Sequence, residues 1–275
     1  MEPLRIPEMT GGEPAPGKMV RQCLPGYAGT QVHHALYLPA DWRAGGSYPV
    51  IAEYTGNCAP MFDSSGEVKD SHMGYGLTKG QGYIWLCLPY ISKDHRRNEK
   101  NWWGDAEATV AYCKQAVSAV CGAYGGDKQA VALCGFSRGA IAVNFIGLFD
   151  DEIAALWSAL IANDYYDGVF VEDYNAWGAS PAWWDAAGER LARLAGRPQL
   201  ILQNDAADRT REIRSYLSDR AAGGSFTFLD VPVARLSGGT PNQYFPHSHT
   251  DRWLLFENAY TAYARNWLRA HGKLK

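Results

Sequence analysis

The sequence carries little net charge and no long run of charge of either sign. Its 26 basic and 29 acidic residues leave a net charge of −3. Nucleic acids and anionic membranes are usually bound through a basic face, so the sequence predicts neither as a partner. Small molecules or neutral polymers are the expected ligands instead. The oligomeric state does not follow from the sequence.

Long hydrophobic runs are also missing. The longest apolar stretches have the length of strands and are too short to cross a bilayer. The first 20 residues are polar, rich in proline and glycine, and contain no apolar signal core. We therefore expect a soluble protein, either cytoplasmic or secreted or periplasmic with its signal peptide absent from this sequence.

Motifs for binding metals are absent as well. The six cysteines show no CxxC spacing, and the histidines at 33, 34, 72 and 95 do not form an HExxH pattern. The sequence thus predicts neither a metal nor a cofactor. Cys87 and Cys134 lie in apolar, strand-like runs, which predicts buried thiols that pack as small hydrophobic side chains.

What the sequence does contain is an alternation of strand-like and helix-like segments. Predicted strands lie within residues 32–39, 48–56, 82–90, 153–164, 198–205 and 225–232, and a further one opens the segment 129–147. Predicted helices lie at about 105–124, at 213–221, and in a closing segment with an aromatic stripe from Trp253 to Trp267. This alternation predicts an α/β fold with a mostly parallel sheet and helices on both faces.

One α/β domain spanning residues 1–275 is the predicted organisation. Within it, residues 1–30 are expected to be irregular. Residues 163–190 are dense in aromatic, aspartate and glycine residues without clear periodicity, which predicts an active-site loop or small cap. In parallel sheets of this kind, ligands bind beyond the carboxyl ends of the strands.

One segment carries a pattern typical of catalysis. Gly135-Phe136-Ser137-Arg138-Gly139 fits G-x-S-x-G, in which a tight turn between a strand and a helix holds an exposed serine in a strained conformation. The residues before it are strand-like, and the residues after it are compatible with a helix. Ser137 is therefore the predicted nucleophile, and the backbone N–H of Arg138 is a predicted donor to an oxyanion.

With this motif the chain resembles the α/β-hydrolase superfamily, and within it the esterase-like branch of feruloyl and acetyl esterases and polyester depolymerases. By the order of its elements the resemblance covers roughly residues 32–270. It implies the α/β-hydrolase fold. It also implies a catalytic triad in which serine, acid and histidine follow one another along the chain.

The resemblance leaves three candidates for the acid. Asp205 and Asp208 both follow the predicted strand that ends at Leu202. Asp208 is preferred, because NDAADRT resembles the family's HGxxDxxV loop, although Asn204-Asp205 replaces the expected His-Gly. Asp164 is the third candidate, since some members place the acid one strand earlier.

The base is expected in the loop PHSHTDRW, which follows the last predicted strand. His249 is preferred, because it lies closer to the last helix, which Thr250 or Asp251 can cap. His247 is the alternative base, and otherwise a residue of the pocket wall.

The remaining site predictions concern the oxyanion and the substrate. Gly56 and Asn57 follow the strand-like EYTG segment and are candidates for the second oxyanion donor. Predicted substrate-binding aromatic residues, able to stack on a sugar ring or an aryl acyl group, are Trp102, Trp103, Tyr165 and Trp183.

Together these features predict a serine esterase that works through an acyl-enzyme on a small-molecule or polymeric ester substrate. The expected ester is that of a carbohydrate or of an aromatic acyl group. An amidase or peptidase with the same triad is one alternative. A non-catalytic carbohydrate-binding protein of the same fold is the other.

Overall fold

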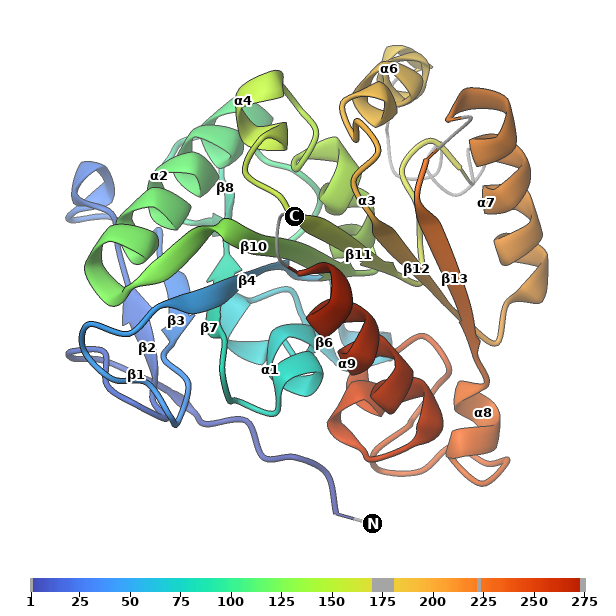
Figure 1. Cartoon of the computed structure of the whole chain (residues 1–275), viewed down its shortest axis with the longest axis horizontal. Coiled ribbons are helices and arrows are strands. Elements are labelled where there is room, and N and C mark those ends of the chain that lie inside the picture. The colour runs from blue at the N-terminus through green and yellow to red at the C-terminus, as the bar shows by residue number, and fades with distance from the viewer. Residues whose placement is uncertain (1, 170–180, 222–223, 273–275) are drawn as a thin grey trace.

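The computed structural model describes residues 2–169, 181–221 and 224–272, without the side chains of 181–185. Within these residues, a nine-stranded sheet in the order β1-β2-β3-β7-β4-β10-β11-β12-β13 forms the centre (Figure 1). The pairs β2–β3 and β3–β7 are antiparallel, and the other neighbours are parallel. This is the mostly parallel sheet that the sequence predicts. In the described ranges, no helix is both long and apolar enough to cross a membrane.

The bounds of the elements follow the predicted alternation. The strands of the central sheet are β1 (Met9–Thr10), β2 (Met19–Gln22), β3 (His34–Tyr37), β4 (Tyr48–Tyr54), β7 (Ile84–Leu88), β10 (Gly126–Phe136), β11 (Ala159–Asn163), β12 (Gln199–Asn204) and β13 (Phe226–Val231). Two small hairpins pair β5 (Cys58–Ala59) with β6 (Ser64–Ser65), and β8 (Tyr90–Ile91) with β9 (Asn98–Glu99). The α-helices in the described part of the chain are α1 (Met73–Thr78), α2 (Ala106–Tyr124), α3 (Arg138–Phe145), α4 (Asp151–Ala154), α6 (Pro181–Ala192), α7 (Ala207–Arg220), α8 (Val233–Leu236) and α9 (Ala259–His271).

Two hydrophobic cores lie on the two faces of the sheet. Side chains alternate along β10, so Val131 and Leu133 enter one core while Ala132 and Cys134 enter the other. Residues of α2, α3 and α7 belong to the first core, and residues of α1 and α9 belong to the second. Figure 1 shows α2, α3 and α7 on one side of the sheet and α1 and α9 on the other. Cys87 and Cys134 are fully buried, as predicted.

Local capping explains where the longest helix begins and ends. The side chain of Asp105 accepts a hydrogen bond from the Ala108 N–H at 2.9 Å, which fixes the start of α2. Gly125 adopts a left-handed conformation at its end. These are the limits that the sequence predicts.

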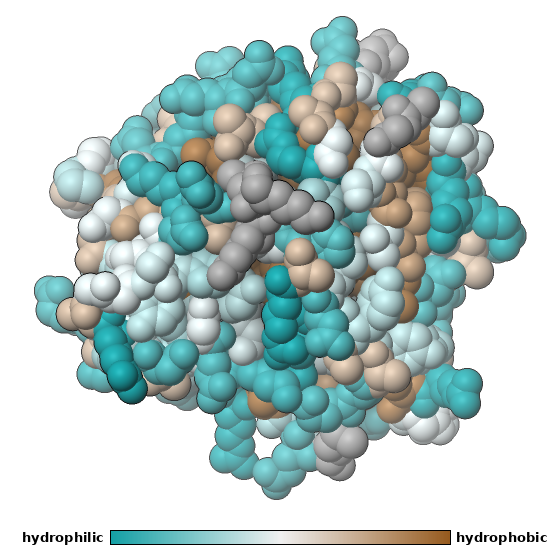
Figure 2. Space-filling model, in the orientation of Figure 1, coloured by the Kyte–Doolittle hydropathy of each residue, from teal (hydrophilic) through white to brown (hydrophobic). Residues whose placement is uncertain are grey.

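The sheet ends in β13, whose side chains are mostly half-buried. Figure 2 shows apolar residues along the side of the molecule where β13 and α7 lie, within an otherwise largely hydrophilic face. The guanidinium of Arg214 on α7 covers the ring of Phe228 at 3.8 Å. A cation thus shields part of the apolar edge from water.

Two predictions about the chain ends are wrong. The N-terminal 30 residues are not wholly irregular, because β2 pairs with β3 and extends the sheet. The aromatic stripe after Trp253 does not belong to one helix. A 3₁₀ turn (Arg252–Leu255) precedes α9, which starts anew where Asn258 accepts from the Thr261 N–H at 2.8 Å. Tyr263, which falls within the predicted stripe from Trp253 to Trp267, is 45% exposed.

The predicted loop or cap at 163–190 is described only in part. Asn163 ends β11, and residues 181–190 belong to α6 rather than to a loop. Residues 170–180 lie outside the described part of the chain.

Gly139 permits the close packing of α3 against β4, and its replacement tests this packing. A Cβ atom at Gly139 would lie 1.9 Å from the carbonyl oxygen of Tyr54. We expect Gly139→Ala to lower the free energy of unfolding, measured by urea denaturation, by about 3 kcal/mol. Gly122→Ala is the control, because Gly122 lies in α2 with open space around it, and alanine there should stabilise by about 0.5–1 kcal/mol. Equal effects of the two substitutions would contradict this reading of the packing.

Candidate active site

Ser137 occupies the turn between β10 and α3. Its backbone angles are φ 56° and ψ −119°, a conformation that costs a non-glycine residue about 1–3 kcal/mol. A Cβ atom at Gly135 would lie 2.2 Å from the carbonyl oxygen of Gly139, so the turn requires glycine at that position. The Ser137 N–H donates to the carbonyl oxygen of Asn163 at 3.0 Å, which ties the turn to β11. The positive end of α3 begins at the next residue, Arg138.

Two hydrogen bonds link Ser137 to a histidine and a buried carboxylate. His249 Nε2 lies 2.9 Å from Ser137 Oγ, and His249 Nδ1 lies 2.5 Å from Asp164 Oδ2. A carboxylate can only accept, so Nδ1 carries the proton, and Nε2 is left to accept from the serine hydroxyl. Asp164 is 3% exposed. This arrangement can remove the hydroxyl proton and place the resulting positive charge next to a carboxylate.

Asp164 reaches the histidine because it immediately follows β11, the strand beside β10. Its backbone has a positive φ of 65°. Its Oδ1 accepts from the Asn204 N–H at 3.2 Å, which fixes the carboxylate from the β12 side. Asp164 was the third candidate from the sequence, and it is the one in contact with His249.

The preference for Asp208 as the partner of His249 is therefore corrected. The sequence predicts a helix from 213, but α7 begins at Ala207 and places Asp208 in its exposed first turn, where it pairs with Arg211. An acidic residue is favoured there by the helix dipole, which explains its presence without catalysis. Asp205, the other candidate, uses its carboxylate to accept from the Ala234 N–H at 2.7 Å.

The loop that carries His249 is fixed on both sides of that residue. The side-chain amide of Asn204 donates to the carbonyl oxygens of Ser248 and Thr250, at 3.0 and 2.7 Å. His247 points elsewhere, since its Nε2–H donates to the carbonyl oxygen of Phe62 at 2.9 Å. Of the two candidate bases, the structure brings His249 to Ser137.

The prediction that Thr250 or Asp251 caps the last helix is wrong. Asp251 makes no capping hydrogen bond, and α9 is capped by Asn258 instead. The Asp251 carboxylate accepts from His72 Nδ1 at 2.9 Å, which connects the loop to the start of α1. Thr250 accepts from the Arg252 N–H at 3.2 Å within the loop itself.

The side chain of Arg138 joins the turn to two neighbouring loops. The residue is 1% exposed, and its guanidinium stacks over the ring of Tyr90 at 3.9 Å. It donates to the carbonyl oxygens of Gly56 and Trp102, both at 2.8 Å, and to the Thr55 hydroxyl at 3.1 Å. Burial lowers the pKa of Arg138 to about 10, which still leaves the group charged near neutral pH. Sequence reasoning assigned a role to its N–H alone and missed the side chain.

The predicted oxyanion residues Gly56 and Asn57 lie beside this turn. A Cβ atom at Gly56 would sit 3.5 Å from Ser137 Cβ. The C=O and N–H of a trans peptide point in opposite directions, so holding the Gly56 carbonyl on Arg138 turns the Asn57 N–H away from the guanidinium. The Asn57 side chain is also held, because its Oδ1 accepts from the Trp102 N–H at 2.8 Å.

A cleft of about 690 Å³ opens over Ser137, and we call it the Ser137 cleft. Of the predicted substrate-binding residues, Trp102 and Tyr165 line it. Trp103 does not, because it packs into the core against Phe145, with ring centroids 4.6 Å apart. The side chain of Trp183 lies outside the described residues. In the part of the chain that the structure describes, no group of three or more His, Cys, Asp or Glu residues could hold a metal ion.

Comparison by sequence found no matching family model and no matching curated protein. Comparison by structure found similar folds at low identity. The isopeptidase AtxE2 aligns with a TM-score of 0.61 and 16% identity, over 92% of this chain and 40% of that one. This chain therefore spans less than half of the isopeptidase.

Two smaller enzymes are matched over more of their own length. An S-formylglutathione hydrolase from Agrobacterium tumefaciens aligns with a TM-score of 0.56 and 14% identity, over 94% of this chain and 95% of that one. An acetyl xylan esterase from Paenibacillus sp. R4 gives 0.55 and 12%, over 88% and 80%. Identities this low establish the fold alone, and the predicted α/β-hydrolase fold is confirmed.

The contact between His72 and Asp251 predicts a pH-dependent stability. Burial opposes protonation of the ring, but the Asp251 carboxylate outweighs it, with Arg252 opposing and Glu53 assisting, and the pKa of His72 is raised. Because the pKa of His72 is higher in the folded protein than in the unfolded chain, protonated His72 stabilises the fold. This stabilisation is fully present below the ordinary histidine pKa of about 6.5 and is lost as the pH rises through the pKa of His72 in the folded protein. We expect His72→Gln to lower the free energy of unfolding, measured by urea denaturation, by about 1 kcal/mol more at pH 5.5 than at pH 8.5. A pH-independent cost would show that the pair contributes no charge interaction.

Proposed function

We propose that the protein is a serine hydrolase that cleaves carboxylic esters through an acyl-enzyme, with Ser137 as nucleophile, His249 as base and Asp164 as acid. The observation that carries the proposal is the pair of hydrogen bonds from Ser137 through His249 to Asp164, at a strained serine on an α/β-hydrolase sheet. Esterases among the structures of similar fold support it.

In the first half of the reaction, His249 Nε2 takes the proton of the Ser137 hydroxyl while Oγ attacks the ester carbonyl carbon. The Asp164 carboxylate keeps Nδ1 protonated and stabilises the imidazolium without becoming protonated itself. The carbon–oxygen bond to the alcohol then breaks. His249 gives its proton to the departing alcohol oxygen, and the acyl group stays on Ser137.

In the second half, water takes the place of the alcohol. His249 removes a proton from the water, which attacks the acyl carbon. The bond from that carbon to Ser137 Oγ then breaks, His249 returns the proton to Oγ, and the acid is released. In both halves the developing oxyanion is stabilised by the backbone N–H of Arg138 and by that of Gly56 or Asn57. A fixed donor aimed at that oxygen is worth about 2.7–4 kcal/mol in other serine hydrolases.

An amidase or peptidase activity is the second candidate, and the similarity in fold to an isopeptidase favours it. The same residues would protonate an amine in place of an alcohol. A p-nitrophenyl ester and the p-nitroanilide with the same acyl group distinguish the two. We expect the ester to be cleaved and the anilide to remain intact. The non-catalytic carbohydrate-binding alternative is disfavoured by the hydrogen bonds among Ser137, His249 and Asp164.

The nucleophile and base are tested by alanine substitutions. Ser137→Ala and His249→Ala should each lower kcat for p-nitrophenyl acetate by roughly 10⁴-fold or more, because each removes the attacking alkoxide. His247→Ala should retain most of the turnover, since His247 contacts the carbonyl of Phe62 and not Ser137. The reverse result for the two histidines would assign the base to His247.

The acid is tested by asparagine substitutions at the three candidate positions. Asp164→Asn should lower kcat by about 10⁴-fold, because the amide favours the wrong imidazole tautomer. Asp208→Asn and Asp205→Asn serve as controls and should stay within about threefold of the wild type. If Asp208→Asn loses most of its kcat while Asp164→Asn remains active, the acid is Asp208, the residue preferred from the sequence.

The guanidinium of Arg138 is tested as a group that positions the oxyanion loop. We expect Arg138→Met to lower kcat by about 10²-fold with a much smaller change in KM, because the Gly56 carbonyl loses its donor. Arg138→Lys should restore part of kcat, since an ammonium can reach only some of the same acceptors. Circular dichroism and urea denaturation establish that both variants are folded under the assay conditions. A loss confined to KM would exclude this role.

A further inference from the structure

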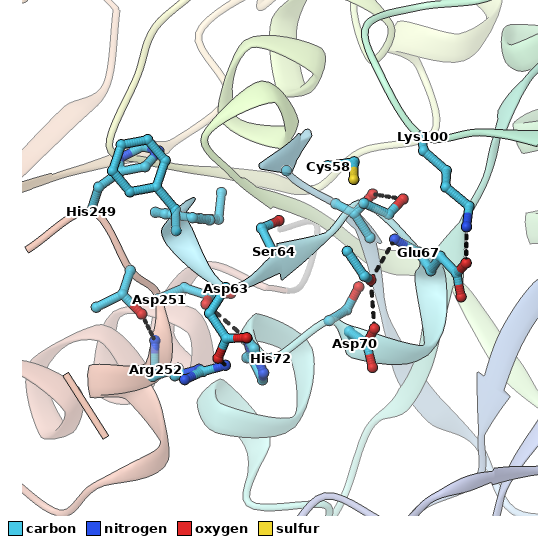
Figure 3. Close-up of a pocket in the computed structure, with 18 of the residues that line it drawn as sticks. Cys58, Asp63, Ser64, Glu67, Asp70, His72, Lys100, His249, Asp251 and Arg252 are labelled. Atoms are coloured by element: carbon cyan, nitrogen blue, oxygen red, sulfur yellow. Dashed lines mark hydrogen bonds and ion pairs between the residues drawn. The ribbon is translucent and has the colours of Figure 1, made fainter. Parts of the chain in front are cut away.

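A second cavity of about 570 Å³ lies beside the Ser137 cleft, and we call it the side chamber. Figure 3 shows His249 at one end of the side chamber and the Lys100–Glu67 pair at the other. Its wall carries apolar as well as charged side chains, so the wall by itself selects no single class of ligand. What the structure does define is the boundary between the side chamber and the Ser137 cleft.

Among the described residues, those that line both cavities form a partition between them: Cys58, Phe62, Ser64, Phe136 and His249. His249 is the proposed base, and Phe136 belongs to the turn that carries Ser137. Cys58 and Ser64 have small side chains. Phe62 is therefore the large side chain of the partition that lies outside the proposed catalytic residues and their turn.

Phe62 stands against the imidazole of the proposed base. The ring centroids of Phe62 and His249 are 5.4 Å apart, and the two planes meet at 69°. In the proposed reaction, His249 Nε2 gives its proton to the oxygen of the departing alcohol, so the alcohol lies next to the imidazole. Phe62 therefore borders the alcohol half of the ester and not the acyl half.

The turn that carries Phe62 is held on two sides. Phe62 lies between β5 and β6, and the next residue, Asp63, pairs with Arg252 at 2.5 Å in the loop that follows His249. On the other side, the Ser64 hydroxyl donates to the carbonyl oxygen of Asn57 at 2.6 Å. The turn is thus tied to the histidine loop and to the proposed oxyanion loop.

His247 holds Phe62 itself. Its Nε2–H donates to the carbonyl oxygen of Phe62 at 2.9 Å, and its ring meets the Phe62 ring edge-on, with centroids 5.0 Å apart. Burial lowers the pKa of His247, so the ring is uncharged near neutral pH and keeps this hydrogen bond as a neutral one. Phe62 is therefore a fixed wall on the side of the Ser137 cleft that faces the side chamber.

We propose that Phe62, held in place by His247, is a specificity-determining residue that limits the size of the alcohol half of the ester by closing the Ser137 cleft off from the side chamber. The inference rests on the proposed function, and it gives a role to the histidine that is not the base. A small alcohol fits within the cleft, whereas a bulky one meets the Phe62 ring. Removing the ring joins the two cavities and admits the bulky alcohol.

The test compares three esters that place the same ring on either side of the reacting carbonyl. They are ethyl acetate, cyclohexylmethyl acetate with a bulky alcohol, and ethyl cyclohexylacetate with a bulky acyl group. We define the alcohol ratio as kcat/KM for cyclohexylmethyl acetate divided by that for ethyl acetate. The acyl ratio is kcat/KM for ethyl cyclohexylacetate divided by that for ethyl acetate. Both are measured on one preparation, so they do not depend on the fraction of protein that is folded.

The variants are Phe62→Ala, His247→Ala and Met61→Ala. We expect Phe62→Ala to raise the alcohol ratio about tenfold over the wild type and to leave the acyl ratio within twofold, because a clash with the bulky alcohol is removed. His247→Ala should raise the alcohol ratio about threefold, since the Phe62 carbonyl loses its donor and the wall can yield. Met61→Ala is the matched control and should change neither ratio, because Met61 is 81% exposed and lines neither cavity.

A double variant tests whether the added space is the side chamber. Ser65 lines the side chamber but not the Ser137 cleft, so a phenylalanine there fills the chamber from its far side. We expect Phe62→Ala combined with Ser65→Phe to return the alcohol ratio to within twofold of the wild type. A full gain in the double variant would show that the bulky alcohol does not enter the side chamber, and would overturn the partition.

The other failures are distinguishable from one another. If Phe62→Ala changes neither ratio, Phe62 does not limit the substrate, while the proposed function stands. If the acyl ratio rises and the alcohol ratio does not, Phe62 borders the acyl half and the assignment to the alcohol is wrong. If the wild type cleaves neither p-nitrophenyl acetate nor any of the three esters, the proposed esterase function fails, and this inference fails with it.

Discussion

The steric constraint at Ser137 is the feature on which the rest of the site depends. A serine with a positive φ can sit between β10 and α3 only if the chain can fold back on itself without side chains in the way. Gly135 and Gly139 provide that space, and Gly139 also lets α3 approach the carbonyl of Tyr54. The turn therefore stores strain that the packed sheet and helix must hold in place.

The geometry around the turn follows from parallel strands ending at one edge of the sheet. Asp164 follows β11 and Gly56 follows β4, the strands on either side of β10, so both reach the surroundings of Ser137. His249 comes from a loop that Asn204 holds by two carbonyl groups. Asp164, Gly56 and His249 are thus positioned by the strand ends or the loop that carries them, and not only by their contacts around Ser137.

The alternation of strands and helices could be predicted from apolar spacing, and the turn at Ser137 from its flanking glycines. The histidine loop could be predicted because it follows the last strand, where the resemblance places the base. It was not sufficient for the acid. Asp164, Asp205 and Asp208 all follow predicted strands, and choosing among them requires knowing that β11 lies beside β10 and that α7 begins at Ala207. The side chain of Arg138 was missed for a similar reason, since its acceptors are backbone carbonyls far away in the sequence.

The central claim is that Ser137 is an activated nucleophile, and covalent labelling tests it most directly. The intact protein is treated with a fluorophosphonate, and the modified peptide is identified by mass spectrometry. We predict a single stoichiometric adduct on Ser137, formed much more slowly in Asp164→Asn and absent in Ser137→Ala. No adduct on the folded wild-type protein, or an adduct on a different residue, would contradict the account.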